Sequence, residues 1–526
     1  MSQLPAGKEV SPGHGVHRYE RHRPEQTLLY QFVEQYYPAF VDQMAALGAT
    51  LPKYVQREFD DYLKCGRLEY GFLRVRCTDC HHERLVAFSC KRRGFCPSCG
   101  ARRMADDCMD AGGRATQGAV AESAALLVDE VLPHAPMRQW VLSFPYPLRF
   151  LFASQPAIMG RALGIVYRTL ATHLIKKAGF TRKTAGTGAV TLIQRFGSAL
   201  NLNIHFHMLF LDGVYVDGVN GSDARFQWVK APTRDELNEL AHTIARRIGR
   251  FLERQGLMER DIENSYLDLG AVDEDPMHAL LGHSITYRIA VGPQAGRKVF
   301  TLQTLPAGDQ EDQFGDTLGK VAGFSLHAGV ATKAHERKKL ERLCRYISRP
   351  AVSEKRLSRT SSGKVRYELK TPYRDGTTQV IFEPLDFIAR LPALVPKPRV
   401  NLTRYHGVFA PNSHLRAQVI PGQRGRRTPV VNEASFTVVE GDEEADRTAA
   451  AGHAAMTWAQ RLKRVFRIDI ETCSHCGGAV KIIACIEDPA VIEKILTHLN
   501  KQTACAKPVP LHESRAPPQV VLFDAP

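Results

Sequence analysis

The chain has 526 residues, which is too many for one hydrophobic core, so we expect two to four domains. With 44% hydrophobic and 24% charged residues it has a globular composition, and no window approaches the roughly 18 uninterrupted apolar residues that predict a membrane span. The net charge of +15 favours an acidic partner, most commonly nucleic acid, although a membrane surface or a ribosome also fits it.

Residues 1–23 are polar and basic and lack the apolar stretch of a signal peptide. We therefore expect a disordered tail and a cytoplasmic protein. Two segments with apolar residues at helical spacing follow, at 25–47 and 52–65. They predict two helices ahead of a cysteine-rich region.

Ten of the twelve cysteines fall into two clusters, at 65–108 and 473–485. Clustered CxxC pairs in a chain without an export signal favour zinc over disulfides. Two of these pairs are separated by fifteen residues, the spacing of a site with four thiolates and no open position. The spacing predicts one structural Zn²⁺ on Cys77, Cys80, Cys96 and Cys99. The neighbouring Cys65, Cys90 and Cys108 are alternative ligands.

The second CxxC pair is surrounded by cations, in the stretch CKRRGFCPSCGARR at residues 90–103. A rigid, zinc-bound turn that carries cations is suited to contacts with phosphate, and the alternative is a solvated basic surface. The candidate DNA-binding residues of this basic knuckle are Lys91, Arg92, Arg93, Arg102 and Arg103.

The next predicted elements are a strand at 138–145, a helix at 156–180, strands at 188–197 and 200–211, and a helix at 235–256. This order predicts an α+β fold in which helices cover a mostly antiparallel sheet. In the strand at 200–211, Asn201, Asn203, His205 and His207 share one face because side chains alternate. Two imidazoles directed to one place can hold a metal, and the alternative is an ordinary half-exposed strand.

A basic helix is predicted at 334–350, followed by a hairpin at 364–384 that turns around Asp375 and Gly376. Residues 421–455 are rich in Pro, Gly and charge and predict a linker. The last module contains the pair Cys473 and Cys476, which lacks a second pair beside it. A second zinc there is possible on this spacing, with Cys485, His498 or Cys505 as further ligands. A helix is predicted at 489–501.

Several of these segments, in this order, resemble the rolling-circle transposases of the insertion-sequence ninety-one family and their ISCR relatives, which belong to the HUH superfamily. The similar segments are SCKRRGFCPSC, QRFGSALNLNIHFHMLFLDGVY, LERLCRYISRPAV, LVPKPRVNLTRYHGVFAPNSHLR and RLKRVFRIDIETCSHCGG. The resemblance implies an N-terminal zinc-binding domain, a strand that carries the two histidines, and a helix that carries a catalytic tyrosine.

The resemblance identifies Tyr346 as the nucleophile, with Tyr405 as a rival. Founding members of the family use two tyrosines one helical turn apart, whereas this chain has Arg342 and Pro350 four residues from Tyr346. The chain therefore resembles the branch with a single catalytic tyrosine. Without the resemblance, a tyrosine on an amphipathic helix more often packs its ring at a domain edge.

The implied reaction is nicking and rejoining of single-stranded DNA at element ends, through a 5′-phosphotyrosine intermediate. The implied catalytic ion is Mg²⁺ or Mn²⁺ on His205 and His207, and Gln194 is our candidate third ligand, against an exposed glutamine as the alternative. Cations on the tyrosine helix are the candidate DNA contacts there: Lys339, Arg342, Arg345 and Arg349. The chain has no Walker-type nucleotide loop.

The predicted domains are a tail (1–23), a helical segment (24–64), a zinc-binding domain (65–112), an HUH catalytic domain (113–350), an accessory segment with the hairpin (351–420), the linker (421–455), a C-terminal CxxC module (456–505) and a second tail (506–526).

Two other functions remain open: a zinc-dependent DNA-binding protein without catalysis, and a rolling-circle replication initiator or relaxase. A DDE-type transposase ranks lower. The sequence does not predict the oligomeric state.

Overall fold

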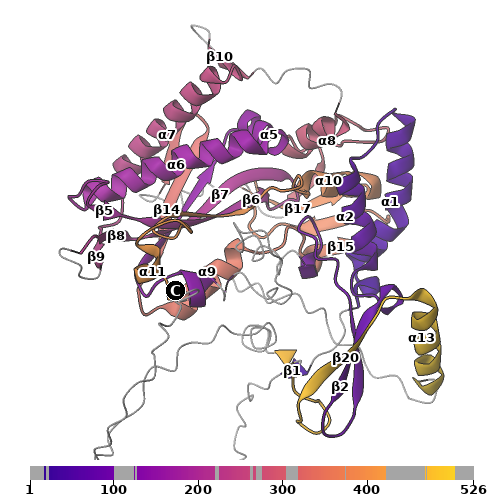
Figure 1. The fold of residues 1–526 in the computed structure, drawn as a ribbon. Helices are drawn as coiled ribbons and strands as arrows, with labels where there is room; N and C mark the ends of the chain where they lie inside the picture. The colour runs from indigo at the N-terminus through magenta and orange to yellow at the C-terminus, as the bar shows by residue number, and fades with distance from the viewer. Residues whose placement is uncertain are drawn as a thin grey trace, which may run out of the picture.

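A six-stranded antiparallel sheet lies at the centre of the computed structural model (Figure 1). The structure describes residues 17–18, 23–99, 124, 127–218, 224–260, 265–267, 275–303, 318–373, 375–421, 468–469 and 471–503. The strand order is β13-β14-β4-β7-β6-β18. The strands are β4 (Met137–Ser143), β6 (Gly188–Phe196), β7 (Leu202–Leu211), β13 (Leu318–Val321), β14 (Phe324–Thr332) and β18 (Thr403–Gly407). The predicted α+β class is confirmed.

Three helices cover one face of this sheet: α5 (Tyr146–Ser154), α6 (Pro156–Lys177) and α7 (Arg234–Arg254) (Figure 1). Helix α7 begins with a capping box, in which Thr233 and Glu236 each accept a backbone hydrogen bond from the other. The Glu236 carboxylate also lies 2.5 Å from the Lys177 ammonium, so the start of α7 is held against the end of α6. Both predicted helices are confirmed, at 156–177 and 234–254.

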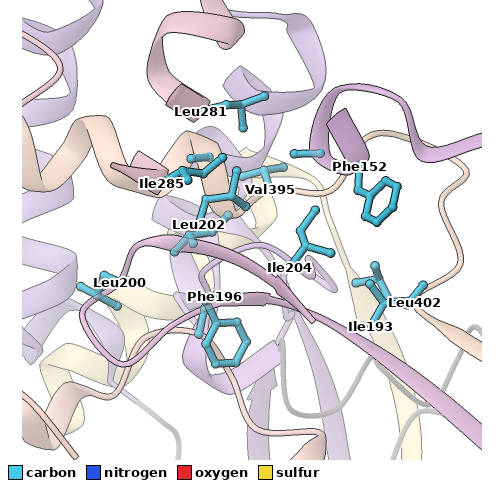
Figure 2. Close-up of a cluster of buried hydrophobic side chains, with 14 of the residues drawn as sticks. Phe152, Ile193, Phe196, Leu200, Leu202, Ile204, Leu281, Ile285, Val395 and Leu402 are labelled. Atoms are coloured by element: carbon cyan, nitrogen blue, oxygen red, sulfur yellow. The ribbon is translucent and has the colours of Figure 1, made fainter. Parts of the chain in front are cut away.

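The apolar side chains of β6 and β7 that point towards these helices form the main core. Figure 2 shows Ile193 and Phe196 of β6, with Leu202 and Ile204 of β7, in one cluster. The cluster also contains Leu281 and Ile285 of α8 (Pro276–Ile285), Phe152, Leu200, Val395 and Leu402. Burial of this many apolar groups makes the strand that carries the histidines a rigid support.

The opposite face of the sheet is covered by α9 (Arg337–Ile347), by α11 (Arg416–Val419) and by a short π-helix, Leu127–Val131. The apolar stripe of α9 is fully buried against the sheet: Leu340, Leu343, Cys344 and Ile347. The strand at 202–211 is therefore buried on both faces, and its histidines lie under α9 instead of facing solvent. The alternative of a half-exposed strand is wrong.

A second sheet has the order β12-β17-β16-β15, from β12 (Phe300–Gln303), β15 (Leu357–Arg359), β16 (Val365–Glu368) and β17 (Thr377–Phe382). The predicted hairpin is confirmed as β16 and β17. Helices α1 (Leu28–Ala46), α2 (Lys53–Lys64) and α10 (Pro384–Leu394) pack beside it, with Phe32 and Phe387 in ring contact at 5.9 Å. This body connects the zinc-binding part of the chain to the central sheet.

A third sheet joins the two ends of the chain, with β2 (Phe72–Cys77) between β3 (Glu83–Ala87) and β20 (Val480–Ile486) (Figure 1). Helix α13 (Pro489–Thr503) follows β20. A small three-stranded sheet has the order β5-β8-β9, from β5 (Ala185–Gly186), β8 (Gly213–Val216) and β9 (Arg225–Trp228). Two further pairs are β10 (Met258–Arg260) with β11 (Ser265–Leu267), and β1 (His17–Arg18) with β19 (Ile468–Asp469). No helix in the described ranges has both the length and the apolarity needed to cross a membrane.

Candidate active site and metal sites

His205 and His207 project from the same face of β7, with their ring centroids 4.8 Å apart. Both side chains are buried, at 9% and 5% exposure. Gln194 lies directly opposite His205 on the neighbouring strand β6, so its side chain is on the same face. The three candidate ligands therefore meet under α9, as the alternation of the strand predicts for the histidines.

Hydrogen bonds orient both imidazoles. Nδ1 of His205 lies 2.9 Å from the Asn203 carbonyl oxygen, an acceptor, so Nδ1–H donates and Nε2 keeps its lone pair. The side-chain nitrogen of Gln139 on β4 lies 2.7 Å from Nδ1 of His207. Rotating the amide by 180° exchanges its nitrogen and oxygen at the same position. In that orientation Nδ1–H of His207 donates to the oxygen, and the lone pair of Nε2 is free to bind a metal. This arrangement is typical of metal-binding histidines.

Burial keeps the two imidazoles neutral. It lowers the pKa of His205 to about 4, and it lowers the pKa of His207 well below its ordinary value, with smaller contributions from His205 and the Arg349 cation. Neutral imidazole is the form that ligates a metal. The side-chain oxygen of Gln194 is buried without a hydrogen-bond partner among the described residues, while its nitrogen donates to the Ile347 carbonyl at 2.6 Å. Two neutral imidazoles and one unpaired oxygen fit a divalent ion.

Tyr346 lies on the last turn of α9, and its ring centroid is 6.4 Å from that of His207, with the rings almost perpendicular. Two cations flank the tyrosine ring: Arg349 at 4.5 Å and Lys370 at 4.2 Å from its centroid. Burial lowers the pKa of Lys370, and the neighbouring Tyr346 opposes that shift. The structure thus brings together the histidine pair and the tyrosine, which are far apart in the sequence.

Lys370 and Gln139 are two residues of this site that the sequence analysis missed. Lys370 follows β16 in the hairpin loop, and nothing in the local pattern distinguishes it from other loop lysines. Gln139 is a polar residue inside a buried strand, at 5% exposure. A polar side chain within an otherwise apolar strand is a signal that the sequence offers, because a buried polar side chain requires a partner.

The other predicted cations of α9 differ in their surroundings. Lys339 lies 3.4 Å from Glu336, and Arg345 lies 2.6 Å from Glu341 on its own helix. Arg342 is exposed. Only Arg349 among the four predicted residues contacts the tyrosine ring in the interactions described. The basic face predicted for this helix is therefore partly neutralised by its own carboxylates.

The basic knuckle is also engaged in contacts within the chain. Arg92 forms an ion pair with Asp61, and Arg93 donates to the Val400 carbonyl at 2.9 Å. Lys91 is exposed. Arg93 lines the same small cavity as Gln194 and Arg349, so the knuckle lies beside the candidate active site. Two further predicted cations fall outside the described residues: Arg102 and Arg103.

The predicted four-cysteine site is wrong in its grouping. One cluster contains Cys65, Cys90, Cys96 and Cys99, with ligand atoms all within 4.8 Å of one another. Cys77 and Cys80 lie in a second cluster with Cys473 and Cys476. The hairpin β2–β3 explains the difference, because Cys77 and Cys80 lie at its turn whereas Cys65 and Cys90 flank its open end. A six-residue strand spans about 20 Å, too far for one ion.

Two of the remaining candidate zinc ligands, Cys485 and His498, are in neither cluster. Cys485 is exposed on β20, and His498 lies on α13. Cys108 and Cys505 fall outside the described residues. The pair at 473 and 476 is thus completed by cysteines from the other end of the chain, which no local spacing indicates.

Comparison with protein families gives two matches. Residues 32–117 match a family described as "Transposase zinc-binding domain", of the insertion-sequence ninety-one type. Residues 188–416 match a family described as "Putative transposase". The second match extends from β6 to α11 and includes His205, His207, Tyr346 and Lys370. No curated protein and no solved structure matches the chain.

Proposed function

Because the chain belongs to the insertion-sequence ninety-one family of transposases, we propose that it nicks and rejoins single-stranded DNA at the ends of its element through a covalent bond to Tyr346. The observation that carries this proposal is the position of the Tyr346 ring, 6.4 Å from the ring of His207. A nucleophile and a pair of metal-ligating groups beside one another are what phosphoryl transfer requires.

The proposed ion site consists of Nε2 of His205, Nε2 of His207 and the side-chain oxygen of Gln194. This ligand set favours Mn²⁺ over Mg²⁺, since Mg²⁺ prefers oxygen ligands. A bound ion would withdraw negative charge from the scissile phosphate and orient it. The chain itself contributes burial, which keeps the two imidazoles neutral. Hydrogen bonds with the Asn203 carbonyl and the Gln139 amide hold the two rings in their orientations.

Tyr346 needs help to react, because a free phenol with a pKa near 10 is ionised in about one molecule in a thousand at pH 7. The Arg349 and Lys370 cations lie at its ring, where they stabilise the phenolate. In the proposed step, the phenolate oxygen attacks phosphorus and the bond from phosphorus to the 3′ oxygen breaks. The phenol proton passes to water, and the leaving 3′ oxygen takes a proton from water.

The products are a 5′-phosphotyrosine and a free 3′-hydroxyl. The covalent bond keeps the energy of the phosphodiester, so attack by a 3′-hydroxyl on the phosphotyrosine rejoins DNA without a nucleotide. We propose one nucleophile, because Arg342 and Pro350 occupy the positions one turn away from Tyr346. Both strand transfers would then use the same tyrosine in succession, or one tyrosine from each of two copies.

The test uses single-stranded oligonucleotides from the ends of the element, labelled at either the 3′ or the 5′ end and incubated with the full chain and Mn²⁺. A 5′-phosphotyrosine keeps the 3′ part of the strand, so only the 3′ label should move with the protein in SDS gels. Tyr346→Phe and His205→Ala should form no adduct, whereas the matched control Tyr405→Phe should form it.

An adduct that carries the 5′ label, or one that persists in Tyr346→Phe, would contradict the mechanism. DNA binding without any adduct, equal in the wild type and Tyr346→Phe, would instead support a zinc-dependent DNA-binding protein. Cleavage and rejoining only at a plasmid origin would support a replication initiator or relaxase.

A further inference from the structure

We propose that a second structural Zn²⁺ joins the two ends of the chain, on Cys77, Cys80, Cys473 and Cys476. This site is separate from the candidate active site and from the cluster formed by Cys65, Cys90, Cys96 and Cys99. The matched zinc-binding family covers residues 32–117, so it includes only half of the proposed ligands. The C-terminal half comes from a segment about which that match says nothing.

The sulfur positions fit one tetrahedral ion. Cys77 Sγ lies 3.4 Å from Cys476 Sγ, and Cys80 Sγ lies 3.6 Å from Cys473 Sγ. All four sulfurs lie within 4.8 Å of one another. Four thiolates at about 2.3 Å from a Zn²⁺ place their sulfurs about 3.8 Å apart at the corners of a tetrahedron. Two separate disulfides would not require all four sulfurs to lie around one point.

Backbone hydrogen bonds support the thiolates of the C-terminal pair. The His475 N–H donates to Cys473 Sγ at 3.4 Å, and the Gly478 N–H donates to Cys476 Sγ at 3.4 Å. N–H donors directed at sulfur stabilise the thiolate form that binds a metal. Gly477 has a φ of +80°, which bends the chain back after the second cysteine.

The N-terminal and C-terminal halves of the site also contact one another through backbone hydrogen bonds. Strand β20 pairs with β2 in antiparallel register from Phe72 opposite Ile486 to Cys77 opposite Val480. The pairing continues past the strand, since Thr78 N–H donates to the Ala479 carbonyl at 2.8 Å. These contacts bring residues almost 400 positions apart into one small sheet.

The turns that carry the two cysteine pairs also contact one another. A Cβ at Gly478 would lie 2.2 Å from an Asp79 carboxylate oxygen, so a larger residue there would require the Asp79 side chain to move. The rings of His82 and His475 stack at 5.8 Å, and α13 packs against Leu68–Tyr70. The C-terminal segment thus completes the N-terminal zinc-binding part and does not form an independent module.

The two metal clusters differ in exposure, which gives the proposal a kinetic signature. Cys80 and Cys476 are exposed, whereas the first cluster has three buried cysteines, Cys65, Cys96 and Cys99. A chelator should therefore remove the ion that joins the chain ends first. The C-terminal segment would then keep its strand pairing with β2 and the packing of α13 against Leu68–Tyr70, without the ion between them.

The first test measures zinc per full-length chain by mass spectrometry of the metal. We expect two Zn²⁺ in the wild type and one in Cys473→Ser/Cys476→Ser. The matched control is Cys485→Ser, which changes an exposed thiol of β20 outside both clusters and should retain two. Two zinc ions in the double variant, or loss of zinc in the control alone, would overturn the proposal.

A second test needs no variant and therefore does not depend on how a variant folds. The zinc-loaded wild type is treated with an alkylating reagent, and the modified cysteines are mapped. Cys485 should react, whereas Cys80 and Cys476 should be protected in spite of their exposure until a chelator is added. Equal reaction of all three thiols before chelation would refute the site.

A third test asks whether the ion joins the two ends. A protease site is inserted between residues 422 and 467, outside the described residues, and the cleaved protein is passed over a sizing column. The C-terminal piece should remain with the rest of the chain, and the chelator or Cys473→Ser/Cys476→Ser should release it. Release that is unaffected by zinc, or retention only in a dimer, would contradict a bridge within one chain.

Discussion

The side-chain amide of Gln139 lies 2.7 Å from Nδ1 of His207, so a residue on β4 determines which nitrogen of that imidazole is free. His207 is one of the two histidines that we propose as ligands of the catalytic ion. The contact connects the hydrogen bonding of a neighbouring strand to metal binding, and it can be tested without any DNA.

Gln139→Leu should weaken Mn²⁺ binding by about 10- to 100-fold, because loss of a partner that orients a ligand costs affinity in that range. The measurement is a Mn²⁺ titration of the zinc-loaded protein, followed by electron paramagnetic resonance. Gln139→Glu keeps an acceptor for Nδ1–H and should bind more tightly than the Leu variant. Equal affinities in the wild type and Gln139→Leu would mean that Nδ1 needs no partner.

Lys370→Met should slow single-turnover formation of the covalent adduct by about 10- to 100-fold, equivalent to about 1.4 to 2.8 kcal/mol in the barrier. The reason is that Lys370 lies 4.2 Å from the centre of the Tyr346 ring, where in the proposed mechanism its positive charge favours the phenolate. The matched control is Lys364→Met on the same hairpin, where the lysine pairs with Glu383 at 2.7 Å. An unchanged rate in Lys370→Met would exclude this role.

Arg138→Met should destabilise the fold by about 3–5 kcal/mol, because it leaves the buried Asp212 carboxylate without its cation. The pair is bidentate, with both N–O distances 2.8 Å, and Arg138 also donates to the Ala328 carbonyl. Urea unfolding provides the measurement. Arg138→Met/Asp212→Leu should recover part of the loss, whereas a double variant as unstable as the single one would show that packing dominates.

Glu58 should make the stability depend on pH. Its buried carboxylate accepts a hydrogen bond from the Gly94 N–H at 2.6 Å, and burial raises the pKa to about 7. Because the folded state holds this proton more tightly than the unfolded state, stability should decrease as pH rises from about 4.5 to about 7, and then level off. The total effect is on the order of 3 kcal/mol.

Glu58→Gln keeps the acceptor and removes the titration, so its stability relative to the wild type should increase between pH 5 and pH 8. Urea unfolding of both proteins at the two pH values measures this difference, and titrations elsewhere in the chain cancel in it. A constant difference between the two proteins would show that Glu58 does not titrate in this window.

Much of the fold could be predicted because its elements depend on neighbours in the sequence. The helix over Arg337–Ile347 follows from its apolar stripe, and the strand over Leu202–Leu211 follows from its alternation. The same alternation places His205 and His207 on one face. The alternative of a half-exposed strand is wrong, because Leu209 and Leu211 on the same face pack under α9.

The sequence by itself determined several helices and strands, among them 156–177, 202–211, 234–254 and 337–347, and the shared face of the two histidines. It also determined the family resemblance from which Tyr346 is proposed as the nucleophile. Each of these depends on a local period or a contiguous motif. Only the tertiary structure decided which cysteines meet, and that Gln139 and Lys370 belong to the site. The physical reason is that strand pairing sets those contacts. The register of β2 with β20, for example, carries Cys77 to Cys476 and away from Cys96, although Cys96 is far nearer in the sequence.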